Sequence, residues 1–60
     1  MNEAQGIMRE FTLTKVEGEY AYLTDEDSKE ELFIAMALLP LGSDIGSRLV
    51  FDGTEFSFKD

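Results

Sequence analysis

The stretch LFIAMALLP at residues 32–40 decides the fold class, because it is compatible with either a helix or a strand. Local signals favour a helix at about residues 29–39. Ser28 and Glu31 have the spacing of a capping box, and Pro40 would end the helix. On this alternative interpretation the fold would be α+β, with its strands and helix in the order ββαββ.

Burial argues for the strand instead. The eight residues before Pro40 are all apolar, so a helix here would have no polar face to turn toward water. A domain of 60 residues is too small to cover such a helix on every side. We therefore expect a short strand with Leu32 and Ile34 pointing into the core and Phe33 pointing outward. One helical or 3₁₀ turn should follow before the proline.

Alternating hydrophobicity predicts two strands before this stretch and two after it. Residues 7–16 alternate apolar and polar side chains, and residues 19–24 follow a Glu-Gly turn as a second strand, so the two form a hairpin. Residues 47–51 and 54–58 form the second pair, joined by Asp52-Gly53, a dipeptide suited to a type I′ turn. The Phe and Leu residues expected to face the core are Phe11, Leu13, Leu49, Phe51, Phe56 and Phe58.

Five strands with one short helical turn after the third predict an all-β fold, a small, partly closed five-stranded OB-like barrel. Partial closure would also limit the strand edges that are open to unwanted pairing. The chain shows no repeat, linker or low-complexity segment. We therefore expect a single domain over residues 7–60, preceded by a flexible segment at residues 1–6.

The composition predicts a small protein with a compact core. Hydrophobic residues make up 43% of the chain, which favours folding over disorder. There is no Cys, so neither a disulfide nor a thiolate metal site can stabilise the domain. No window reaches the roughly 18 to 20 apolar residues of a membrane span, and the N-terminus lacks the parts of a signal peptide. We expect a cytoplasmic protein that does not associate with membranes.

The formal net charge of -8 comes from 13 acidic and 5 basic residues. Such a charge repels phosphate groups and anionic lipids at long range. An acidic surface can serve solubility alone, or it can recognise a basic protein partner.

Tyr20 and Tyr22 are the most informative functional signal. Strand alternation places both phenol rings on one face and Ala21 on the other, and Phe33 has the same outward phase on a neighbouring strand. A platform of exposed rings suits the stacked bases of single-stranded RNA or DNA. The alternative is that these rings are buried against the N-terminal segment or in a homodimer. The candidate nucleic-acid-binding residues are Tyr20, Tyr22 and Phe33, with Lys15, Arg9 and Arg48 as local cations.

Three segments resemble the cold-shock type of OB-fold domain, a five-stranded barrel that binds single-stranded RNA and DNA. GEYAYL at residues 18–23 resembles the first ribonucleoprotein motif of that family, Lys-Gly-Phe-Gly-Phe-Ile. LFIAM at residues 32–36 resembles its second motif, and DIGSRLVFD at residues 44–52 resembles a later strand. The resemblance implies a cold-shock-like barrel with a nucleic-acid-binding aromatic face.

The chain departs from this family on the expected binding face. Glu19 lies beside the first motif, Ala35 stands where the second motif has His, and Met36 stands where it has its last Phe. These changes weaken the surface as a nucleic-acid site. The chain also resembles a family of short acidic bacterial proteins of unassigned role, which share an aromatic strand, a Leu-Leu-Pro turn and a Gly-x-x-Leu-x-Phe strand over residues 16–51.

Catalysis is disfavoured by the residue types present. There is no His, and none of the four Ser residues has an evident base to activate it. The acidic residues 25–31 do not form an EF-hand loop, because Lys29 and Glu30 occupy a ligand position and the position of the turn Gly. We therefore expect no enzymatic activity, no metal and no cofactor.

Two functions remain compatible with the sequence. The first is a non-enzymatic β-barrel module that binds single-stranded RNA or DNA through its aromatic face. The alternative is an acidic protein-interaction module, either an adaptor or an inhibitor that mimics nucleic acid, which docks on a basic protein.

Overall fold

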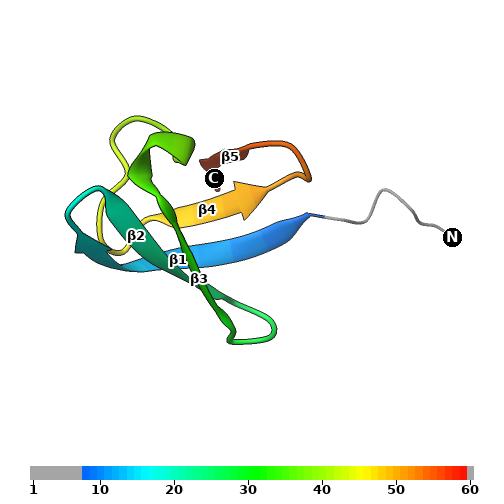
Figure 1. Ribbon diagram of the computed structural model, residues 1–60. Coiled ribbons are helices and arrows are strands. Elements are labelled where there is room, and N and C mark those ends of the chain that lie inside the picture. The colour runs from blue at the N-terminus through cyan, green and yellow to red at the C-terminus, as the bar shows by residue number, and fades with distance from the viewer. Residues whose placement is uncertain (1–7, 60) are drawn as a thin grey trace, which may run out of the picture.

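The computed structural model describes residues 8–59 (Figure 1). Its elements, in chain order, are β1 (Arg9–Glu17), β2 (Tyr20–Asp25), β3 (Glu31–Ala35), the 3₁₀ turn η1 (Met36–Leu38), β4 (Arg48–Phe51) and β5 (Phe56–Phe58). The five strands described form one sheet in the order β3-β2-β1-β4-β5, and every neighbouring pair is antiparallel. The flexible segment expected at residues 1–6 lies outside the described residues.

The predicted all-β fold is confirmed, and the alternative with a helix at residues 29–39 is wrong. β3 occupies the first half of the ambiguous stretch, and helical conformation is confined to the three residues of η1. As a strand, this apolar segment packs Leu32 and Ile34 against the core. A helix would have left much of its apolar surface in water.

The sheet is not a closed barrel over residues 8–59. β3 and β5 lie at its two edges and do not pair with each other. Because each neighbouring pair is antiparallel, β3 and β5 run in the same direction, so closing the sheet would require a parallel pair. Parallel pairing is slightly less stable per residue, and β5 has three residues to offer.

The core lies on one face of this curved sheet. Its buried residues are Phe11, Leu13, Ala21, Leu23, Leu39 and Leu49. The inward orientation predicted for the residues on β1 and at the centre of β4 is therefore confirmed. Leu39, which follows η1, adds a contact from the segment that leads away from β3.

The three C-terminal Phe residues are less buried than predicted. Phe51 and Phe56 contact each other, with ring centroids 4.8 Å apart, and are partly buried against the core. Phe58 lies opposite the buried Leu49, which confirms its predicted inward orientation, but it is 44% exposed and so is not part of the core. The physical reason is that β5 is an edge strand, and no further strand covers it among the described residues.

The β4–β5 connection contains the predicted Asp52-Gly53 turn, but it is not a type I′ turn. φ is positive at Gly53, at 99°, and not at Asp52, whereas type I′ needs both. Instead the Asp52 side chain accepts hydrogen bonds from the backbone N–H groups of Thr54 and Glu55, at 2.8 and 2.9 Å. The longer loop is thus organised by a side-chain acceptor.

Candidate functional site

Three aromatic side chains, Tyr20, Tyr22 and Phe33, lie together on the outer face of β2 and β3 and are called the aromatic patch. The Phe33 ring stacks on Tyr20 at a centroid distance of 4.9 Å and is tilted against Tyr22 at 4.8 Å. Tyr20 is 48% exposed and Phe33 is 54% exposed. The structure therefore brings together the rings that the sequence placed on one face, and it leaves Tyr20 and Phe33 exposed and Tyr22 partly exposed.

Strand pairing explains this arrangement. Phe33 lies directly opposite Tyr22, and Ala35 lies opposite Tyr20. The small side chain of Ala35 leaves room for the Phe33 ring to lean toward Tyr20, its diagonal neighbour. Ala21, between the two tyrosines, turns inward and is fully buried.

A β-bulge in β1 brings Lys15 to the aromatic patch. The register between β1 and β2 shifts between Leu13 and Lys15, so that Lys15 rather than Thr14 lies opposite Tyr22. The Nζ atom of Lys15 lies 5.2 Å from the centroid of the Tyr22 ring, within cation–π range. Strict alternation along β1 would have turned Lys15 toward the core. Lys15 was predicted from the sequence as a cation of the binding site, but the bulge that places it there was not predicted.

Glu17 holds the Tyr22 phenol, a role that the sequence did not indicate. The Tyr22 hydroxyl donates a hydrogen bond to Glu17 Oε1 at 3.2 Å, and Lys15 Nζ lies 3.7 Å from Glu17 Oε2. The hydrogen bond to this carboxylate raises the pKa of Tyr22 above its ordinary value of 10.0. Tyr22 is therefore a neutral donor, and the charge of Lys15 is paired.

The other two cations of the predicted site form ion pairs away from the aromatic patch. Arg9 donates from Nε and Nη2 to Asp25 Oδ2, at 2.9 and 2.7 Å, and its guanidinium lies 5.2 Å from the Phe11 ring centroid. Arg48 forms a two-point ion pair with Glu26 and lowers the pKa of that carboxyl to about 2. Of the three predicted cations, Lys15 alone lies beside the rings.

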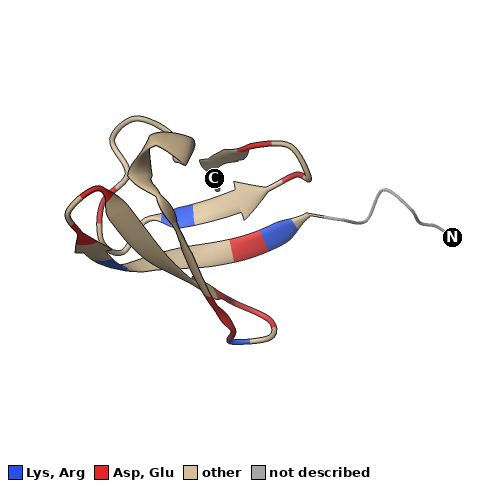
Figure 2. Cartoon of the chain, viewed as in Figure 1, with Lys and Arg blue, Asp and Glu red and all other residues tan. Residues whose placement is uncertain are grey.

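Carboxylates border the aromatic patch, and Glu17 and Glu31 are called the acidic rim. Glu17 lies opposite Tyr20, and Glu31 lies two residues before Phe33 on the same face of the sheet. The charges of Glu17 and Glu31 also contribute to the raised pKa of the nearby phenol. Figure 2 shows acidic residues where β3 begins and at the turn between β1 and β2, and no charge along the rest of β3.

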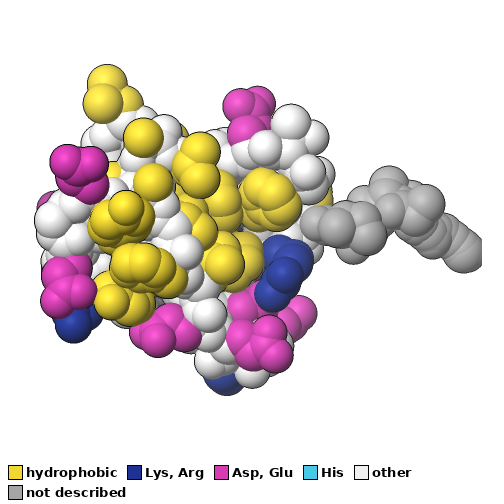
Figure 3. Space-filling model, viewed as in Figure 1, with side chains coloured by type: hydrophobic (Ala, Val, Ile, Leu, Met, Phe, Trp, Pro, Cys, Tyr) yellow, Lys and Arg dark blue, Asp and Glu magenta, His cyan; other side chains and the backbone are white. Residues whose placement is uncertain are grey.

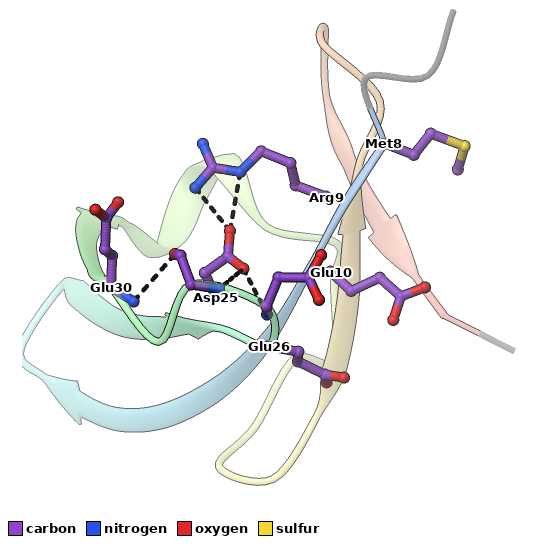
Figure 4. A pocket seen from close by; sticks show the side chains of 8 residues that line it. Met8, Arg9, Glu10, Asp25, Glu26 and Glu30 are labelled. Atoms are coloured by element: carbon purple, nitrogen blue, oxygen red, sulfur yellow. Dashed lines mark hydrogen bonds and ion pairs between the residues drawn. The ribbon is translucent and has the colours of Figure 1, made fainter.

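A separate hollow of about 480 Å³ lies beside the ion pair of Arg9 and Asp25 (Figure 4). Asp25 is 4% exposed, and its Oδ1 accepts backbone hydrogen bonds from Asp27 and Ser28 at 2.7 and 3.0 Å. The bond from Ser28, followed by that from Arg9, lowers the pKa of Asp25.

Sequence reasoning treated the loop that borders this hollow as solvated, and it missed the buried carboxylate. Five of the eight lining residues are Asp or Glu, so the hollow lacks the apolar lining of a small-molecule site. We assign it a structural role in holding the loop to β1.

Two further findings bear on the expectations for metal and membrane binding. Across residues 8–59, no group of three or more acidic side chains is arranged to hold a metal ion. In the same part of the chain, no helix has the length and hydrophobicity needed to cross a membrane.

Comparisons of the chain with protein families, with curated proteins and with solved structures found no match. The resemblance to cold-shock domains and the resemblance to short acidic bacterial proteins therefore stay predictions. The functional argument rests on the geometry and charge of the aromatic patch.

Proposed function

We propose that the protein is a non-enzymatic interaction module that binds a basic protein partner through the aromatic patch and the acidic rim. The observation that carries this proposal is the arrangement of charge around the exposed rings. Glu17 and Glu31 border them, whereas Lys15, the predicted cation beside them, is paired with Glu17. Such a surface attracts Lys and Arg side chains and repels phosphate.

A basic side chain has two kinds of contact available at this surface. It can lie over the exposed face of a ring, a cation–π contact worth about 0.5 to 1 kcal/mol at an exposed site. It can also reach a carboxylate of the acidic rim. The net charge of -8 steers a basic partner toward the protein, so association should be fast and sensitive to salt.

Single-stranded nucleic acid is the second candidate, favoured by the three rings on neighbouring strands. Bases stack on such platforms for about 1 to 3 kcal/mol each. Backbone phosphates, however, require cations beside the rings. Arg9 and Arg48 form ion pairs with Asp25 and Glu26 instead, and for this reason we place nucleic acid second.

Binding measurements with two probes separate these candidates. The protein is titrated with a Lys- and Arg-rich peptide and with a labelled single-stranded oligonucleotide, each at low and moderate salt. We expect the peptide to bind, more weakly as the salt concentration rises, and the oligonucleotide not to bind. Oligonucleotide binding without peptide binding would reverse the order of the candidates, and binding of neither probe would refute the proposal.

Substitutions locate the binding surface. Phe33→Ala and Glu31→Gln should each weaken peptide binding about three- to tenfold, the range expected from the loss of one cation–π contact or one charge pair. Phe58→Ala is the matched control, because Phe58 is also an exposed ring, 44% exposed compared with 54% for Phe33, but lies on β5. Equal weakening by Phe58→Ala and Phe33→Ala would mean that the peptide adheres to apolar surface without using the aromatic patch.

A further inference from the structure

We infer that the basic partner binds as an added strand along the open edge of β3, through an extended segment in which Lys or Arg alternates with aliphatic residues. This inference rests on the proposed function and specifies the form of the partner. In strand addition, main-chain hydrogen bonds supply affinity and alternate side chains supply specificity.

The hydrogen bonds at the two ends of the β2–β3 pairing define which backbone groups of β3 are used. At one end, the N–H of Asp25 donates to the carbonyl of Glu30 at 2.8 Å. At the other end, the N–H of Met36 donates to the carbonyl of Glu19, also at 2.8 Å. Hydrogen-bonded pairs alternate with non-hydrogen-bonded pairs along an antiparallel ladder, so every second residue of β3 is bonded to β2.

The remaining residues of β3 direct their backbone groups away from β2. By this alternation Leu32 and Ile34 are bonded to β2, whereas the N–H and C=O groups of Glu31, Phe33 and Ala35 point toward the edge. β2 is the one sheet neighbour of β3 among residues 8–59. The edge therefore offers a row of donors and acceptors at the spacing that an additional strand requires.

Few features of β3 discourage pairing. Edge strands are commonly protected by Lys, by Pro or by a bulge. β3 has neither Lys nor Pro, its pairing with β2 is regular, and its four residues after Glu31 are uncharged. By contrast, β5 at the other edge is three residues long and so offers few backbone groups for pairing.

Both faces of an added strand would find apolar contacts. On the outer face, Phe33 is 54% exposed. On the inner face, Leu32 and Ile34 pack against the core but are only partly buried. Figure 3 shows hydrophobic side chains gathered over β3 and η1 and continuing toward β5, with acidic side chains around them.

The charge and polarity of the two faces set the sequence of the partner. Residues of the added strand that lie opposite Glu31 and Phe33 fall on the outer face, where a Lys or Arg meets a carboxylate or a ring. Residues opposite Leu32 and Ile34 fall on the inner face, where aliphatic side chains extend the core. The partner segment should therefore alternate basic and aliphatic residues.

A second copy of the chain is a less favourable occupant of the same edge. Each copy carries a net charge of -8, so two copies repel each other at long range. β3 also begins with Glu31, preceded by Glu30, and has no cation to offer to a second acidic edge. A basic segment meets neither obstacle.

Amide hydrogen exchange followed by NMR tests the inference. The probes are a peptide of sequence Lys-Val-Arg-Val-Lys and a peptide of the same composition in the order Lys-Lys-Arg-Val-Val. In the protein alone, the amides of Glu31, Phe33 and Ala35 should exchange faster than those of Leu32 and Ile34. The alternating peptide should slow exchange of the first three amides about tenfold or more, and the rearranged peptide should not.

A proline substitution at Ala35 tests the edge, and a valine substitution at the same position controls for any effect of the larger side chain on the rings. Ala35 has φ of -71°, which proline adopts without strain, and its N–H faces the edge rather than β2. Ala35→Pro should therefore weaken binding of the alternating peptide about three- to tenfold, the effect of one lost hydrogen bond. Ala35→Val is the matched control, since it adds a side chain of similar size and retains the N–H.

The outcomes separate this inference from the proposed function. Peptide binding that depends on Phe33 but leaves the edge amides unprotected, or that is equal in Ala35→Pro and Ala35→Val, overturns strand addition and leaves the proposed function standing. Absence of peptide binding overturns both. Slow exchange of the edge amides in the protein alone also overturns strand addition. If the protection of these amides increases with protein concentration, the occupant of the edge is a second copy.

Discussion

The Arg9 guanidinium donates two hydrogen bonds to a single carboxylate oxygen of Asp25, at 2.9 Å from Nε and 2.7 Å from Nη2. The other oxygen of Asp25 accepts two backbone hydrogen bonds from the loop that leads to β3. One buried carboxylate thus joins β1 to this loop. The position at which β3 begins depends on this connection, and so does the position of Glu31, the first residue of β3.

We predict that Asp25→Asn lowers stability more than Asp27→Asn. Asn retains the shape of the side chain but loses the charge that strengthens its hydrogen bonds with Arg9. Asp27 is exposed and takes part in this network through its backbone N–H, so its substitution should leave the unfolding midpoint nearly unchanged. Urea unfolding of both variants measures the difference. Equal midpoints would show that the ion pair adds nothing to stability.

Stability should decrease as the pH falls from about 4.5 to about 2. The pKa of Glu26 is lowered from 4.5 to about 2, first by the hydrogen bonds from Arg48 and then by that from Thr12. The unfolded chain takes up a proton at Glu26 before the folded chain does. The stabilisation is therefore complete above the unfolded pKa and is lost as the pH falls through the folded pKa. The lowered pKa values of Asp25 and Asp52 act in the same direction.

Urea unfolding at a series of pH values checks this dependence. Glu26→Gln should show a flatter profile than the natural chain within this window. An unchanged slope would mean that other carboxylates account for the loss of stability.

Replacing Glu17 should make the Tyr22 phenol easier to ionise. The hydrogen bond to the Glu17 carboxylate is the main cause of the raised pKa of Tyr22. Glu17→Gln should therefore shift the pKa back toward 10.0, measured from tyrosinate absorbance in a Tyr20→Phe background. Glu19→Gln, which removes a neighbouring charge without this hydrogen bond, is the control and should leave the titration nearly unchanged. If both variants shift it equally, general charge rather than the hydrogen bond is responsible.

The aromatic patch should contribute little to folding compared with the core. Leu23→Ala should cost about 2 to 5 kcal/mol, because this side chain is fully buried and its removal leaves a cavity. Phe33→Ala should cost about 1 kcal/mol or less, since the ring is half exposed and loses mainly its contacts with two tyrosines. Urea unfolding compares the two. Similar costs would indicate that the Phe33 ring serves the fold rather than binding.

Burial, rather than local helix signals, correctly predicted the conformation of the ambiguous stretch. Ser28 and Glu31 have the spacing of a capping box, but in the structure the Ser28 hydroxyl accepts a hydrogen bond from the N–H of Glu30 within the loop, at 3.2 Å. The same side-chain chemistry that caps helices also organises turns. The apolar run that follows could be covered by a small domain as a strand but not as a helix.

The positions of the cations could not be predicted from the sequence. Arg9 pairs with a residue 16 positions away, and Arg48 pairs with one 22 positions away. No local sequence pattern indicates either ion pair, because both depend on the order in which the strands pair. The sheet is open where a partly closed barrel was expected, and the cause is related. The length of β5 and its direction relative to β3 depend on the whole sheet.

The Thr14 bulge has a practical consequence for anyone who redesigns this surface. Before the bulge the odd-numbered residues of β1 face inward, and after it Val16 packs against the core while Lys15 lies beside Tyr22. A combinatorial library that assumed regular alternation would randomise Val16 as a solvent position and disrupt packing. A library that takes the shifted alternation into account would vary Lys15 and Glu17, and could alter binding specificity without disrupting the core.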